Sequence, residues 1–446
     1  MKKKLNRNAS LLFLIMLMAF IWRATYNRLD LMEEGVPDQY GYETSQVAKS
    51  IATGHGFGNP YPLIQTGPTA IMPPVYPYLL AGIYKLFGVH SWASYLVATS
   101  LSGLFSTLIC MPIFFLGRRL GGDICGLVAA GLWAVFPTAI ALTTGPISGV
   151  WDTTLSALCA ALVLSATLAV RDSDRTRNWA AYGLLLAFAL EVNPSLFSTL
   201  PFLFLWLFWE LRKRRRSWMK LSASAVLLAV LGCTPWCVRN YVVFHRFVPF
   251  RSNLGLELWL GNNPEDHDIF PDWRSPYTSW IETREYARLG EMEFMKEKER
   301  KAITYMTANP WATARATYWR FAVTWTGLAV RVEDVWPKLR FGDRIAFIVN
   351  IVLGIGGWVG TWLLIRRRSE YAMPFLVFLV FYPAVYYLTH SSLRYRHPID
   401  PALMVLTTFC IAAALRAAVR RADPAPTLAA SDTAAQNDTQ QVSAAN

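Results

Sequence analysis

Residues 149–177 read GVWDTTLSALCAALVLSATLAVRDSDRTR, and this stretch carries the pattern that decides the fold. Asp152 is the only charged residue between positions 149 and 170, and Arg171 is the first of several bases that follow. A helix of about 20 apolar residues matches the hydrocarbon thickness of a bilayer. The pattern therefore predicts a membrane-spanning helix with basic residues at one end.

Similar apolar runs recur along the whole chain of 446 residues, of which 54% are hydrophobic and only 16% charged. A soluble domain would carry about 25% charged residues. The composition therefore excludes a disordered polymer, a disulfide-rich secreted scaffold and an ordinary cytosolic enzyme. We expect an all-α polytopic membrane protein with ten spans. These lie near 9–27, 92–117, 124–142, 149–170, 179–192, 195–211, 220–238, 343–365, 371–389 and 400–418.

The distribution of charge predicts the topology. When the N-terminus is placed in the cytoplasm, the whole excess of +13 falls on the cytoplasmic ends and loops of these spans. Lys and Arg are enriched on the cytoplasmic side of membrane proteins, so nucleic-acid binding is a poor explanation of the charge. Residues 1–22 lack a small-residue cleavage site, which favours an uncleaved first span over a signal peptide. Both termini are therefore expected in the cytoplasm.

The cytoplasmic loops are short and contain no GxxxxGK[ST] motif, which argues against ATP-driven transport within this chain. The long segments between spans fall on the outer side, where we expect the chemistry. The predicted regions are a cytoplasmic end with the first span (1–25), a first outer segment (26–91), spans two to seven (92–238), a large outer segment (239–342), spans eight to ten (343–418) and a disordered cytoplasmic tail (419–446).

The first outer segment begins with DQYGY at residues 38–42, about ten residues beyond the first span. A helical pattern starts near Tyr40 and ends at a run of glycines from Gly54. After Pro73 and Pro74, the aromatic stretch 75–87 favours a helix lying at the membrane interface.

The large outer segment contains a charged stretch, 281–309, that predicts one helix ending at Pro310. The aromatic stretch 311–325 follows and is typical of an interfacial anchor, with a substrate contact as the alternative.

These motifs bring a family resemblance into view. Asp38 just beyond the first span and the proline pair before an aromatic helix resemble the GT-C superfamily of membrane glycosyltransferases. Within it, the chain looks like the branch that contains the protein O-mannosyltransferases and the bacterial aminoarabinose transferases of lipid A. Further matches are PW at 235–236 with RNY at 239–241, GN at 261–262 and RYRHPIDP at 394–401.

The resemblance implies a helical-bundle enzyme that transfers a sugar from a polyprenyl-phosphate carrier on the extracytoplasmic side. Asp38 is then the expected general base, with helix capping as its structural alternative. Relatives often carry a second acid near the first Asp or before the prolines, but here Gln39 follows Asp38 and Met72 precedes Pro73. Glu43 is the nearest substitute for that second acid.

Other residues are candidates for binding the donor or lining its cavity. Arginine suits a phosphate because its planar fork donates two parallel hydrogen bonds. Snorkelling to ordinary lipid phosphates is the alternative for any single arginine at a span end. Acids near the outer ends of spans often face a cavity or pair with an arginine. The phosphate candidates are Arg239, Arg394, Arg396, His397 and Lys85, and the cavity candidates are Tyr40, Tyr42, Asp152 and Glu191.

No set of residues in the sequence indicates a cofactor or a divalent metal. The expected partners are the lipid-linked sugar donor, an acceptor of unknown class and membrane lipids, in a bacterial inner membrane. The alternative functions are a transporter or flippase of a lipid-linked saccharide, and a non-enzymatic assembly protein. The large outer segments favour the transferase, because a flippase needs access from both faces.

Overall fold

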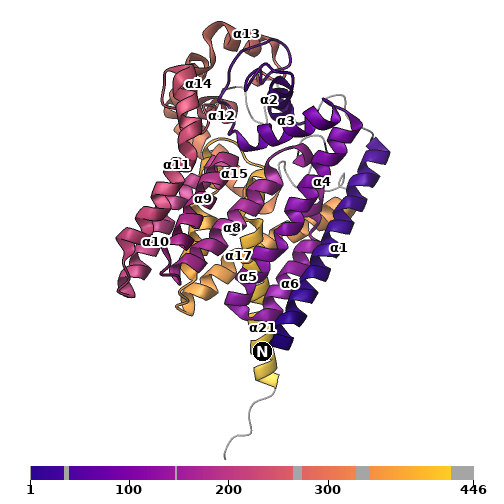
Figure 1. The fold of residues 1–446 in the computed structure, drawn as a ribbon, viewed down its shortest axis with the longest axis vertical. Coiled ribbons are helices and arrows are strands. Elements are labelled where there is room, and N and C mark those ends of the chain that lie inside the picture. Colours follow the sequence, from indigo (N-terminus) through magenta and orange to yellow (C-terminus); the bar gives the residue numbers. More distant parts are fainter. Residues whose placement is uncertain (1, 35–39, 146–147, 265–273, 328–340, 423–446) are drawn as a thin grey trace, which may run out of the picture.

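The structure is a computed structural model, and it describes residues 2–34, 40–145, 148–264, 274–327 and 341–422. Within these ranges the chain is all-helical and forms no β-sheet, as predicted. The helices form a tall bundle with a smaller layer of helices at one end (Figure 1).

The bundle is built from helices of very different lengths. They are α1 (Lys2–Glu34), α4 (Trp92–Leu108), α5 (Cys110–Gly121), α6 (Asp123–Ala134), α7 (Pro137–Ala141), α8 (Thr153–Arg171), α9 (Thr176–Val192), α10 (Leu200–Lys213), α11 (Trp218–Phe244), α15 (Pro310–Thr326), α17 (Phe341–Arg366), α18 (Ala372–Phe381), α19 (Ala384–Leu388) and α21 (Asp400–Ala422).

Shorter elements complete the outer layer and the connections. They are α2 (Tyr42–Ala52), α3 (Val75–Phe87), α12 (Leu254–Gly261), α13 (Trp280–Leu289), α14 (Glu291–Ala308) and α20 (Leu393–Arg396), with the 3-10 turns η1 (Ser148–Val150), η2 (Pro194–Thr199) and η5 (His397–Ile399).

Seven helices among the described residues are long and apolar enough to cross a membrane, so the chain is a multi-pass membrane protein. The other three predicted spans fall on shorter helical segments. Run 124–142 corresponds to α6 and α7, run 179–192 to α9, and run 371–389 to α18 and α19. The seven spans are Arg7–Glu33, Trp92–Gly121, Thr153–Arg171, Pro194–Lys213, Trp218–Phe244, Arg344–Arg366 and Leu393–Val419.

The two ends of the bundle differ. The N-terminus and the last turns of α21 lie at the same end, whereas α2, α3 and α12–α14 form the layer at the opposite end (Figure 1). This arrangement brings the first and the large outer segments, which are far apart in the sequence, into one layer.

A buried carboxylate joins the two outer segments. Glu291, at the start of α14, accepts hydrogen bonds from the Thr69 hydroxyl at 2.5 Å and the Ala70 amide at 2.8 Å in the first segment. It also accepts from Ser252 and from Tyr286 in the second segment. Four donors compensate the cost of burying the carboxylate, so this contact fixes one segment against the other.

The structure corrects two predicted helix boundaries. The stretch 281–309 forms two helices rather than one, because Gly290 adopts a φ of 75° and separates α13 from α14. A left-handed residue ends a helix, and glycine adopts that conformation without a steric penalty. The first outer helix begins at Tyr42 rather than near Tyr40. The predicted disordered tail falls almost wholly on residues 423–446, outside the described residues.

Candidate active site

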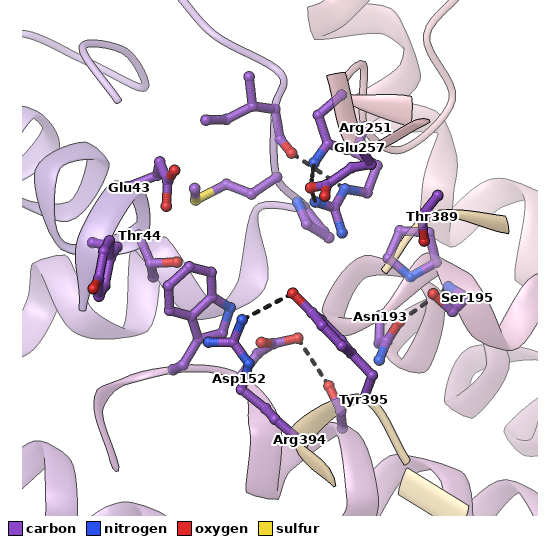
Figure 2. A pocket seen from close by; sticks show the side chains of 18 of the residues that line it. Glu43, Thr44, Asp152, Asn193, Ser195, Arg251, Glu257, Thr389, Arg394 and Tyr395 are labelled. Carbon is purple, nitrogen blue, oxygen red and sulfur yellow. Dashed lines mark hydrogen bonds and ion pairs between the residues drawn. The ribbon is translucent and has the colours of Figure 1, made fainter. Parts of the chain in front are cut away.

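A cavity of about 650 Å³ lies where the outer layer meets the bundle. Its walls come from α2, the residues before α3, the start of α8, the turn after α9, the segment around α12, and α19 with α20. Figure 2 shows Glu43, Asp152, Arg251 and Arg394 reaching towards it from different parts of the chain. Aromatic side chains contribute much of the remaining wall, among them Tyr42, Tyr76, Trp151, Tyr277, Tyr382 and Tyr386.

Glu43 is a half-buried carboxylic acid in this wall, in the first turn of α2. Burial raises the pKa of Glu43 to about 7, and Glu257 adds to the rise, whereas Arg394 and Arg251 oppose it. A carboxyl group with a pKa near neutrality can accept a proton and return it at physiological pH.

Arg394 is a cation in the same cavity wall as Glu43 and Asp152. One guanidinium nitrogen, Nη2, donates to the Tyr395 hydroxyl at 2.9 Å, and the guanidinium carbon lies 4.7 Å from the centre of the Trp151 ring. The other terminal nitrogen, Nη1, is buried and has no hydrogen-bond partner among the described residues. An unpartnered buried donor is rare and costly, so Nη1 is available to an anionic ligand.

A second cation, Arg251, lies across the cavity from Arg394 (Figure 2). Its Nε donates to the carbonyl oxygen of Ile71 at 3.2 Å, and its Nη2 lies 3.6 Å from the Glu257 carboxylate. The cavity thus combines two arginines, three carboxyl groups and aromatic faces. Such a site can bind an anionic head group and a sugar and can move one proton.

The sequence matches a known family over part of its length. Residues 72–238, from just before α3 to within α11, match the family model described as dolichyl-phosphate-mannose-protein mannosyltransferase. This match covers less than half of the chain, so it shows a similarity to the family over this region. No protein of curated function matches the sequence.

The fold of this chain is similar to that of a solved membrane transferase. The archaeal oligosaccharyltransferase AglB from Archaeoglobus fulgidus, in complex with an inhibitory peptide and a dolichol-phosphate, aligns with a TM-score of 0.56 and 13% identity. The alignment covers 95% of this chain but 53% of AglB, so the chain spans about half its length. ArnT from Cupriavidus metallidurans, bound to undecaprenyl phosphate, aligns with a TM-score of 0.39 and 14% identity over 94% of this chain and 81% of ArnT.

Four of the residues singled out in the sequence line the cavity: Tyr42, Glu43, Asp152 and Arg394. Asp38 lies outside the described residues. Tyr40 is buried behind the cavity wall, where its hydroxyl pairs with Ser94 at 2.8 Å. Glu191 is buried in α9 next to lining residues but is not one of them, and Lys85 is exposed on α3.

Three predicted phosphate ligands have structural partners instead. Arg239 donates to the carbonyl oxygens of Thr69 at 2.7 Å and Phe57 at 2.8 Å, and so fastens the first outer segment to α11. Arg396 is fully buried, and its Nε lies 2.7 Å from an Asp400 oxygen.

His397 is also fully buried, with Nδ1 3.1 Å from the other Asp400 oxygen. The structure therefore brings none of Arg239, Arg396 and His397 to the cavity.

Sequence reasoning missed Arg251, Glu257, Trp151 and Tyr395 as parts of the site. Arg251 immediately precedes the turn-rich stretch 252–255, and Tyr395 lies between two arginines that were singled out. Trp151 lies next to Asp152, which was predicted to line the cavity. The proximity of these residues to a motif was the only available signal, because their convergence depends on how distant segments pack.

The different environments of Arg394 and Arg396 lead to a prediction for stability. Arg396→Ala leaves Asp400 buried without its cationic partner, which typically costs about 3–5 kcal/mol. We expect a marked fall in the thermal unfolding temperature of the detergent-solubilised protein. Arg394→Ala, two positions earlier, removes no partner of a buried carboxylate and should unfold close to the wild type. Equal unfolding temperatures for Arg396→Ala and the wild type would contradict the structural role.

Proposed function

We propose that this chain is a membrane glycosyltransferase that takes a sugar from a polyprenyl-phosphate donor and transfers it to an acceptor hydroxyl. The observation that carries the proposal is the unpartnered Nη1 of Arg394 in a cavity that also presents the Glu43 carboxyl group. The similarity of residues 72–238 to the mannosyltransferase family supports the reaction class. The acceptor and the sugar are not part of the proposal.

The donor phosphate would bind at Arg394, with Arg251 as a second cation across the cavity. A single lipid phosphate carries little charge compared with a diphosphate, so two arginines suffice to compensate it as it leaves. Donors fixed in place before the reaction stabilise developing charge more effectively than water does. The aromatic wall suits the sugar, whose apolar faces pack against rings.

The reaction would proceed as one displacement. The acceptor oxygen attacks the anomeric carbon, and the bond from that carbon to the phosphate oxygen breaks with its electron pair remaining on the phosphate. The acceptor proton passes to a carboxylate. A single displacement inverts the configuration at the anomeric carbon.

The proton acceptor would be one of two carboxylates in the stretch 38–43. Asp38 is the candidate from the family resemblance, and Glu43 is the candidate from the cavity. The raised pKa of Glu43, caused mainly by burial, favours a role in proton transfer near pH 7.

The topology forms part of the proposal. Ten spans with both termini in the cytoplasm would put the cavity on the extracytoplasmic face of a bacterial inner membrane. The basic cytoplasmic loops support this orientation.

The phosphate site can be tested by binding. Arg394→Ala should weaken the binding of a polyprenyl monophosphate in detergent micelles by about tenfold or more, since charge-assisted hydrogen bonds contribute about 1.5–3 kcal/mol. Arg394→Lys keeps the charge but loses the planar fork, so its affinity should lie between those of the wild type and Arg394→Ala. Arg246→Ala, which removes an exposed arginine outside the cavity, is the control. Unchanged binding by Arg394→Ala would show that the phosphate binds at another site.

The base can be tested by turnover per folded molecule, with lipid-linked sugars from host membranes as donor and mass spectrometry as readout. Removing a positioned base costs about a hundred- to ten-thousand-fold in rate. A collapse in Asp38→Asn with activity kept in Glu43→Gln assigns the role to Asp38, and the reverse assigns it to Glu43. If Glu43 is the base, the wild-type rate should rise as the pH increases through about 7. Full activity in both variants would remove both carboxylates from catalysis.

Cysteine labelling can test the topology. In a Cys-free background, a membrane-impermeant thiol reagent applied to intact cells should label cysteines at Gln65 and Arg288. A cysteine at Lys213, the last residue of α10, should react only after the membrane is permeabilised. Labelling in the opposite pattern would invert the proposed orientation.

A further inference from the structure

A chain of polar contacts runs behind Arg394 along the cavity wall. The Tyr395 hydroxyl accepts from Arg394 Nη2 at 2.9 Å and lies 2.7 Å from His390 Nε2. On its other side, His390 Nδ1 lies 3.2 Å from a Glu257 oxygen. These residues come from two elements far apart in the sequence, α12 and the segment around α20.

The chemistry of the groups fixes the direction of the protons in this chain. A guanidinium only donates, so the Tyr395 oxygen is the acceptor towards Arg394. The negative charge of the Glu257 carboxylate, 3.2 Å from His390 Nδ1, favours the imidazole proton on Nδ1. In a neutral imidazole the other nitrogen, Nε2, is then an acceptor and receives the Tyr395 hydroxyl proton.

The surroundings of His390 support the neutral form. The side chain is buried, and burial lowers the pKa of His390. Arg394, Arg320 and Arg251 lower it further, and Glu257 is the one neighbour that raises it. Tyr395 faces the same groups and also stacks on Tyr386, with ring centres 4.8 Å apart.

Glu257 is itself held in place. Asn253 donates to one of its oxygens at 2.5 Å, and Arg251 Nη2 lies 3.6 Å from the same oxygen. The other oxygen faces His390. The carboxylate is therefore fixed at the far end of the chain, where its charge acts on the His390 ring.

We propose that Glu257, His390 and Tyr395 are positioning residues that orient the Arg394 guanidinium so that its Nη1 points at the donor phosphate. This inference rests on the proposed function, because it assumes that Arg394 binds that phosphate. Nη2 already donates its hydrogen bond to the Tyr395 hydroxyl, and the guanidinium lies over the Trp151 ring. The unpartnered Nη1 is the group that these contacts leave for the ligand.

A double-mutant cycle tests this positioning role. Tyr395→Phe keeps the stacked ring and removes only the hydroxyl. In binding assays with a polyprenyl monophosphate in detergent micelles, we expect it to weaken affinity by about tenfold, because Arg394 loses its fixed orientation. In an Arg394→Ala background the same change should have no further effect, because the group being positioned is absent. Glu257→Gln should also weaken phosphate binding, by a smaller factor, and should have no further effect in the Arg394→Ala background.

Two comparisons separate positioning from general damage. The neutral polyprenol should bind Tyr395→Phe and the wild type equally, since it lacks the phosphate that Arg394 contacts. Tyr387→Phe removes a neighbouring hydroxyl that accepts from Trp325 at 3.0 Å outside the cavity, and it should bind the phosphate normally.

The outcomes decide separately on the two proposals. Additive losses for Tyr395→Phe and Arg394→Ala, or equal losses for the phosphate and the polyprenol, would overturn the positioning role while leaving the phosphate site intact. Unchanged phosphate binding by Tyr395→Phe in an otherwise wild-type chain would also overturn it. Full phosphate binding by Arg394→Ala alone would instead overturn the phosphate site of the proposed function.

Discussion

The cavity depends on the buried carboxylate of Glu291, which accepts four hydrogen bonds, two of them from the other outer segment. Arg239 adds a second connection by binding backbone carbonyls of Thr69 and Phe57. These contacts hold the first outer segment, which carries α2 and Glu43, against the segment with Arg251. A carboxylate that receives four hydrogen bonds is expensive to release, so the outer layer is held as a unit above the bundle.

The arginines singled out in the sequence have different surroundings in the structure. Arg239 and Arg396 find all or most of their partners within the protein, and each ties distant segments together. Arg394 differs from these two because one of its nitrogens has no hydrogen-bond partner among the described residues. This difference is the basis for proposing Arg394, and not the other two, as the phosphate ligand. A charge near the end of a span is therefore weak evidence of a binding site.

The sequence was sufficient for the fold class and for part of the site. Apolar runs such as 149–170 set the helices, because span length and composition follow directly from the bilayer. Glu43 and Arg394 were identified because they lie in or beside short motifs. Arg251 and Glu257 were missed because their place in the cavity depends on long-range packing of α12 against the rest of the layer. Arg396 and His397 were misplaced because the sequence gives no sign that Asp400, one helical turn away, engages both.

The central claim is that this membrane protein breaks the bond between a sugar and a polyprenyl phosphate. The most direct measurement is mass spectrometry of lipids after incubation of the purified protein with lipid-linked sugars extracted from host membranes. Our account predicts that one sugar-linked species disappears and that polyprenyl monophosphate appears in equal amount. Transbilayer movement of an intact lipid-linked sugar in reconstituted vesicles, with no release of polyprenyl monophosphate under any acceptor supplied, would contradict it.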